Sequence, residues 1–113
     1  MAAGLVASNP VDAQLAAYNA QDLDAYCACF TEDIVIEDGA GKAISRGKAT
    51  MRENYARMFA AHPDNHCDIL HRIAVGDFVI DHERISGRGP EPFHAVAVYR
   101  IAGGLIQHVR FLK

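Results

Sequence analysis

The hydrophobic pattern changes its period along the chain, and this change limits the fold more than any other feature. Three stretches before residue 63 carry apolar residues at the three- and four-residue spacing of amphipathic helices. These stretches are 10–19, 22–30 and 48–62. After residue 66 apolar and polar residues alternate, which is the pattern of half-buried strands. We therefore predict an α+β fold in which three N-terminal helices pack on one face of a strongly curved antiparallel sheet.

Capping and turn residues indicate where these elements begin and end. Asn9-Pro10 and Asp22 are typical helix starts, because their side-chain oxygens accept from free backbone N–H groups and Pro fits the first helical position. Tight turns at Gly76-Asp77 and Gly103-Gly104, and a longer turn at 87–90, separate four strands that we expect to pair antiparallel in sequence order. The expected strands are 34–36, 43–44, 67–75, 78–86, 93–101 and 105–112.

The composition is that of a small globular domain with no polyanionic partner. The 113 residues are 50% hydrophobic and 22% charged, and we expect one domain over residues 9–113 after a loose tail at 1–8. The net charge is −3 without a Lys/Arg cluster, so no binding to nucleic acid or to membranes is indicated. Residues 1–8 lack the features of a signal peptide, and a cytoplasmic location is the expectation.

Cysteine and histidine are placed in a way that favours neither a disulfide framework nor a metal site. Cys27, Cys29 and Cys67 are odd in number and stand in apolar surroundings, so we interpret them as buried small hydrophobes. The six histidines form no His-x-x-x-His pair, and no glycine-rich nucleotide loop is present. We predict no cofactor.

Several motifs resemble the NTF2-like superfamily, especially its SnoaL-like and ketosteroid isomerase-like branch. They are Asn19–Asp24, Phe30–Asp33, Ile36–Asp38, the helix entry Arg46–Lys48, and the final hairpin with 97–101 and 105–111. The resemblance covers about residues 10–112. It implies a cone-shaped fold with a pocket, and a homodimer formed through the outer face of the sheet. It does not fix an activity, because this fold hosts isomerases, cyclases, dehydratases, hydrolases and binding modules.

The resemblance assigns one catalytic residue, replaces a second with a weaker donor and removes a third. Asp38 matches the carboxylate that moves a proton beside a ketone in the isomerases. Their two donors to the ketone oxygen correspond to Gln14 and Ala97 here, and alanine cannot donate a hydrogen bond. Loss of a preorganised donor of this kind costs about 3–4 kcal/mol, so we do not expect efficient steroid isomerisation.

Strand alternation indicates which other side chains enter the pocket. If Ala97 points inward, so do Phe93, Ala95 and Tyr99, and on the last strand Gln107, Val109 and Phe111. The residues between them point outward, so Val96 and Val98 form an apolar outer face that suits binding of a second copy of the chain. Strand 78–86 has two possible registers, and one of them would bring Asp81 and Glu83 to the pocket with Asp38. Alternatively, Asp81 and Glu83 pair with arginines across the sheet, and Asp38 merely stabilises the turn before Gly39.

Two functions remain open at this point. The first is a cofactor-free enzyme acting on a small, mostly apolar carbonyl compound, with Asp38 as the base. The side chains expected to bind the substrate are Gln14, Tyr18, Tyr55, Asp81, Glu83, Tyr99 and Gln107. The second is a non-catalytic dimeric domain that binds a ligand or assists another protein.

Overall fold

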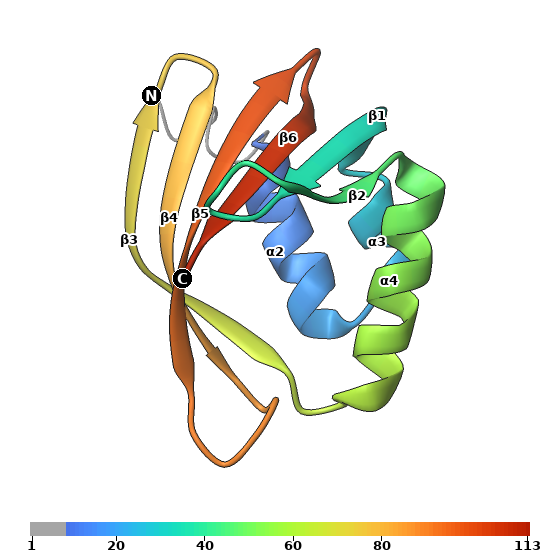
Figure 1. The fold of residues 1–113 in the computed structure, drawn as a ribbon, viewed down its shortest axis with the longest axis vertical. Coiled ribbons are helices and arrows are strands. Elements are labelled where there is room, and N and C mark those ends of the chain that lie inside the picture. The colour runs from blue at the N-terminus through green and yellow to red at the C-terminus, as the bar shows by residue number, and fades with distance from the viewer. Residues whose placement is uncertain (1–8) are drawn as a thin grey trace.

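Three helices lie on one side of a curved six-stranded sheet (Figure 1). The computed structural model describes residues 9–113, so the tail predicted at 1–8 lies outside the described residues. The helices are α2 (Pro10–Ala20), α3 (Leu23–Cys27) and α4 (Lys48–Ala61). The strands are β1 (Phe30–Glu37), β2 (Ala43–Arg46), β3 (His66–Val75), β4 (Phe78–Ser86), β5 (Phe93–Ala102) and β6 (Leu105–Leu112). The predicted α+β architecture is therefore confirmed, with α3 shorter than expected because β1 already begins at Phe30.

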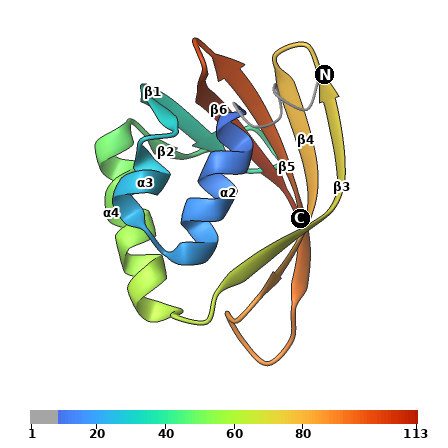
Figure 2. The ribbon, with the colours of Figure 1, turned by 180° about the vertical axis from the view of Figure 1, so that it is seen from behind.

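The sheet runs in the order β2-β1-β6-β5-β4-β3. Strands β3 to β6 form the antiparallel meander that the tight turns predicted. Strand β1 instead pairs parallel with β6, so one pair of the sheet departs from the antiparallel pattern. Strands β2 and β3 are the two edges, and the sheet stays open. Seen from behind in Figure 2, α2 contacts β3 and β6, whereas α4 lies along β1 and β2.

The predicted helix caps are present and fix the start of each N-terminal helix. Asn9 Oδ1 accepts a hydrogen bond of 2.8 Å from the Val11 amide, with Pro10 at the first helical position. Asp22 Oδ1 accepts from the Ala25 amide at 3.1 Å. These bonds satisfy donors that the helix itself leaves free, so the sequence determines both helix starts locally.

Aromatic rings from all three helices and from β1 form one cluster in the core. The ring centroid of Tyr26 lies 4.6 Å from that of Tyr55 and 4.9 Å from that of Phe30. Tyr18 meets Phe59 edge-on at 5.8 Å. Each such ring removes a large apolar area from water, and tilted or edge-on pairs add about 0.5–1.5 kcal/mol beyond that. The cluster therefore holds the helices together above the sheet.

Of the two registers considered for β4, the structure has the one that turns Asp81 and Glu83 to the inner face of the sheet. Val79, Asp81, Glu83 and Ile85 are buried, and the residues between them are more exposed. The neighbouring strand follows the predicted alternation as well, with Ala95, Ala97 and Tyr99 buried. Strand β4 thus carries two carboxyls on the buried face of the sheet, two residues apart.

A β-bulge in β3 supplies the partner of one of these carboxyls. The register shifts between Ile69 and His71, so Leu70 is left without a partner residue and the alternation of β3 reverses. The reversal brings Arg72 opposite Asp81. Arg72 donates through Nε to Asp81 Oδ1 at 2.6 Å and through Nη2 to Asp81 Oδ2 at 2.9 Å.

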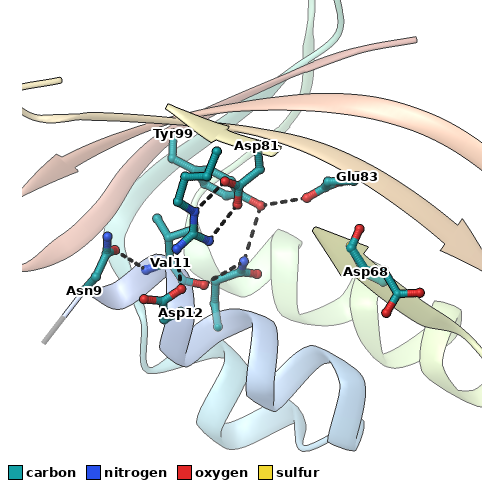
Figure 3. A network of polar contacts seen from close by, with 10 residues as sticks. Asn9, Val11, Asp12, Asp68, Asp81, Glu83 and Tyr99 are labelled. Atoms are coloured by element: carbon teal, nitrogen blue, oxygen red, sulfur yellow. Dashed lines mark hydrogen bonds and ion pairs between the residues drawn. The ribbon is translucent and has the colours of Figure 1, made fainter. Parts of the chain in front are cut away.

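The same guanidinium also bonds Asp12 on α2, and Figure 3 shows both carboxylates in this network. The cross-strand pairing of Asp81 with an arginine, one of the two alternatives, is therefore confirmed. Because α2, β3 and β4 all contribute to it, the Asp12–Arg72–Asp81 cluster ties the first helix to the sheet.

We predict that Asp81→Asn lowers the free energy of unfolding by about 3 kcal/mol, because it leaves a partly buried guanidinium without its bidentate partner. Urea unfolding measures the loss. The matched control is Asp68→Asn, since the half-exposed Asp68 lies 3.9 Å from Arg84 in a solvent-screened pair and should change stability by less than about 0.5 kcal/mol. Equal losses in the two variants would contradict a stabilising role for the cluster.

Candidate functional site

A cavity of about 250 Å³ lies between the helices and the inner face of the sheet. Most of its wall is aromatic or aliphatic, with Ile36, Ile85, Phe93 and Phe111 among the contributors. The polar side chains in the wall include Gln14, Tyr18, Tyr55, Glu83, Arg88 and Tyr99. An apolar cavity with a few converging polar groups is the usual form of a small-molecule site.

Glu83 is held in this wall by a chain of hydrogen bonds. The Tyr99 hydroxyl donates to Glu83 Oε2 at 3.2 Å, a contact drawn dashed in Figure 3. Gln14 Nε2 in turn donates to the Tyr99 hydroxyl at 3.3 Å and to the Val11 carbonyl at 3.1 Å. All three side chains are buried. The helix start at Asn9-Pro10 therefore fixes Gln14, and Gln14 and Tyr99 orient the carboxyl of Glu83.

Burial raises the pKa of Glu83 to about 7. The hydrogen bond from Tyr99 and the charge of Arg88 oppose this rise, whereas the negative charge of Asp81 adds to it. Unlike Asp81, Glu83 has no direct cationic partner within residues 9–113. A carboxyl with a pKa near neutrality takes up and releases protons efficiently at neutral pH, which suits a general acid or base.

Arg88 occupies the part of the wall that follows β4. Its Nε donates to Asn65 Oδ1 at 2.7 Å, and its Nη2 donates to the Tyr18 hydroxyl at 2.5 Å. Gly87 makes this placement possible. It has a φ of +86°, and a Cβ there would lie 2.0 Å from the Asp64 carbonyl oxygen. From the sequence, 87–90 was predicted only as a turn, so Arg88 was missed. The signal available in the sequence was an arginine two residues after the end of the strand that carries Glu83.

Five of the predicted binding residues meet in the cavity: Gln14, Tyr18, Tyr55, Glu83 and Tyr99. Asp81 is also on the buried face of the sheet, but it belongs to the cluster with Arg72 and does not line the cavity. Gln107 is also absent from the wall. The register between β5 and β6 shifts between Arg100 and Ile101, which leaves Gln107 without a partner and brings the fully buried Ile106 inward instead. Gln107 is therefore not among the residues that line the cavity.

Asp38 does not join Glu83 in the cavity. Its Oδ1 accepts from the backbone amides of Ala40 at 2.9 Å and Lys42 at 3.0 Å, so the side chain stabilises the turn between β1 and β2. It borders a second hollow that shares Ile44, Phe111 and Lys113 with the main cavity. The expected convergence of Asp38, Asp81 and Glu83 in one site is not found: Glu83 borders the cavity, Asp81 bonds Arg72, and Asp38 bonds its own turn.

Cysteine and histidine lie where they add no reactive group to the cavity. All three cysteines are buried and unpaired, and burial raises the pKa of Cys67, which borders the cavity, to about 12. His71, His82 and His94 form a row across the sheet, with nitrogens 3.1 and 2.8 Å apart. Within residues 9–113 no three His, Cys, Asp or Glu side chains are arranged to hold a metal ion. No helix in the same range is long and apolar enough to cross a membrane.

Comparisons with known proteins point to one family. The family model of the SnoaL-like domain matches residues 11–109. An uncharacterised cystatin-fold protein from Novosphingobium aromaticivorans is 36% identical, with a TM-score of 0.86 over 92% of this chain and 95% of its own. A proposed polyketide cyclase from Sinorhizobium meliloti is 23% identical, with a TM-score of 0.80 over 90% and 92%.

An LEH-like epoxide hydrolase from M. tuberculosis is 24% identical, with a TM-score of 0.77 over 91% of this chain and 78% of its own. At these identities the cyclase and the hydrolase show a shared fold alone. No curated protein matches the chain significantly.

The raised pKa of Glu83 predicts a specific dependence of stability on pH. Between its ordinary value of 4.5 and about 7, the folded protein holds a proton that the unfolded chain has released. Stability from this group is therefore fully present below about pH 4.5 and is lost as the pH rises to about 7. Glu83→Gln stays neutral, so it should be more stable than the parent by roughly 3 kcal/mol at about pH 8, and the gain should disappear at about pH 4.5.

Urea unfolding of both proteins across this pH range measures the effect. Glu91→Gln, on the exposed segment before β5, is the control and should reproduce the parent's curve. A pH-independent difference between Glu83→Gln and the parent would contradict the raised pKa.

Proposed function

Since the chain belongs to the SnoaL-like domain family, as the motifs at its two ends indicated, we propose that it is a cofactor-free enzyme that moves a proton on a small, mostly apolar carbonyl compound in the cytoplasm. The observation that carries this proposal is Glu83, a buried carboxyl with a pKa near 7 in the wall of an apolar cavity. Similar solved structures include proteins described as a polyketide cyclase and an epoxide hydrolase, which is compatible with acid–base chemistry on this fold.

The proposed reaction begins with Glu83 as a carboxylate. It takes a proton from the carbon beside the carbonyl group, and the electron pair of the broken C–H bond moves to the carbonyl oxygen as an enolate. The protonated Glu83 then returns the proton to another carbon. Alternatively, the enolate attacks a second carbonyl carbon of the same substrate, and the protonated Glu83 gives its proton to the alkoxide that forms there. Both outcomes leave Glu83 as it began.

Tyr18 and Tyr55 are the donors that we propose for the enolate oxygen. Burial raises the pKa of Tyr18 above its ordinary value and that of Tyr55 to about 12, so both keep their hydroxyl protons at neutral pH. The Tyr18 hydroxyl already accepts from Arg88, which leaves its own hydrogen available to a ligand. Donors of this kind in an apolar site stabilise developing negative charge far better than water does.

Glu83 takes the role that the resemblance gave to Asp38. The carboxyl of Asp38 is engaged by two amides of its own turn, and it lies at a different hollow. A base must reach the proton that it removes, and only Glu83 borders the main cavity.

We predict that Glu83→Gln slows proton removal by about a hundredfold or more, the usual contribution of a positioned general base. The measurement is exchange of deuterium from heavy water into a panel of small aryl and alicyclic ketones, followed by NMR. Asp38→Asn is the matched control and should keep the parent's rate. If Asp38→Asn lost the activity and Glu83→Gln kept it, the base would be Asp38.

A non-catalytic ligand-binding domain is the second candidate function. It is favoured by Ala97, which stands where the isomerases carry an acidic donor and is fully buried. Under this alternative no ketone of the panel exchanges deuterium, but small molecules that fill the cavity still raise the melting temperature.

We further propose that the outer face of the sheet binds a second copy of the chain. Its centre is Val96 and Val98, and exposed Ile73, Val75 and Phe78 extend it, with exposures of 59%, 68% and 47%. Arginines and carboxylates border this apolar centre, among them Arg84 with Asp68 and Arg110 with Glu37. A face that carries both signs of charge around an apolar centre can complement itself across a two-fold axis.

We predict that Val98→Glu raises the dissociation constant of the homodimer by about a hundredfold or more, because each interface would bury unpaired carboxylates. Sedimentation velocity over a dilution series measures this constant. Ala56→Glu, on the exposed side of α4, is the control and should leave the dimer intact. A parent protein that stays monomeric at every concentration would disprove the interface.

A further inference from the structure

Arg88 places a cation in the cavity wall without a carboxylate to neutralise it. Its two hydrogen-bond partners, Asn65 and the Tyr18 hydroxyl, are both neutral. Among residues 9–113 it forms no ion pair, and no hydrogen bond from its Nη1 is found. Arg72 shows the contrast, because it bonds two carboxylates and does not line this cavity. The charge of Arg88 is therefore available to something inside the cavity.

The surroundings of Arg88 suit an anion attached to an apolar body. The Arg88 guanidinium lies 5.7 Å from the centroid of the Phe93 ring, and Lys113 Nζ lies 5.3 Å from the same centroid. Both cations and the ring border the cavity. The other charged group in the wall, Glu83, is neutral while it holds its proton. Even when Glu83 is a carboxylate, the two cations Arg88 and Lys113 leave an excess of positive charge in the cavity wall beside an aromatic surface.

Guanidinium geometry narrows the choice of anion. An arginine fork binds a planar carboxylate through two parallel N–H bonds, and such charge-assisted pairs are about twice as strong as neutral hydrogen bonds. The bonds to Asn65 and Tyr18 hold the fork in place, and the turn at Gly87 is fixed by its close approach to Asp64. The donor is thus preorganised, which reduces the entropy lost on binding.

We propose that the ligand of this cavity is a keto acid whose carboxylate binds Arg88, whose apolar body lies against Phe93 and Ile85, and whose carbonyl end reaches Glu83. The inference rests on the proposed function for the carbonyl end and extends it by naming the substrate class. The part of the inference that assigns a carboxylate to the ligand rests on Arg88 and not on the proposed reaction. The cavity of about 250 Å³ accommodates a ligand with one aromatic ring and a short chain.

The test compares an acid with its neutral counterpart. The probes are 4-oxo-4-phenylbutanoate and its primary amide, and isothermal titration calorimetry measures both dissociation constants. We expect the parent to bind the acid about tenfold or more tightly than the amide. Arg88→Gln should remove this preference, and Arg88→Lys should restore part of it, because a point charge remains without the fork. Circular dichroism of each variant establishes that it is folded.

Glu83→Gln separates this proposal from the proposed function. It should keep the preference for the acid and lose deuterium exchange into the keto acid. If Glu83→Gln kept the exchange while Arg88→Gln lost the acid preference, the proposed chemistry would fail and the carboxylate site would stand. Equal affinity of the parent for the two probes, survival of the preference in Arg88→Gln, or binding of neither probe would overturn the carboxylate site.

Discussion

The cost of burying charge on strand β4 is the constraint on which the rest of the structure depends. Asp81 and Glu83 stand two residues apart on the buried face, and an isolated ionised carboxyl there would be strongly destabilising. The protein resolves this cost in two different ways. Asp81 receives a bidentate arginine and becomes part of the framework, whereas Glu83 receives only a phenol and keeps a proton near neutral pH. One strand therefore contains both a structural carboxylate and a carboxyl that gains or loses its proton near neutral pH.

The extra residues in two strands decide which side chains reach the cavity, and they could not be predicted from the sequence. Plain alternation expects Gln107 inward and gives no reason for Arg72 to face Asp81. The unpaired Leu70 brings Arg72 opposite Asp81, and Gln107, which is unpaired as well, does not line the cavity. A bulge depends on pairing with neighbouring strands, and neither Leu70 nor Gln107 is a residue type that marks one locally. Local signals were sufficient elsewhere, because the caps at Asn9 and Asp22 and the glycine turns act within a few residues.

The candidate site was predictable in its apolar and aromatic parts and less so in its charged ones. Gln14, Tyr18, Tyr55 and Tyr99 follow from helical and strand periodicity together with the family resemblance. Asp38 was expected to act because of its position in the family pattern, but its oxygen bonds two amides in its own turn. For Asp38 the local interaction outweighed the analogy. Arg88 was missed because its role arises from contacts with Asn65 and Tyr18, which are 23 and 70 residues away in sequence.

The site also separates chemistry from recognition along the chain. Glu83 lies within a strand that pairs on both sides, and Tyr99 and Gln14 fix its carboxyl from β5 and α2. Arg88 lies on the turn that follows, where a substitution disturbs no strand pairing. On the roles proposed above, a change at the turn would alter how the ligand's carboxylate is held without moving Glu83. The reverse does not hold, because Glu83 shares its strand with Asp81, and a change that shifts β4 also breaks the cluster that ties α2 to the sheet.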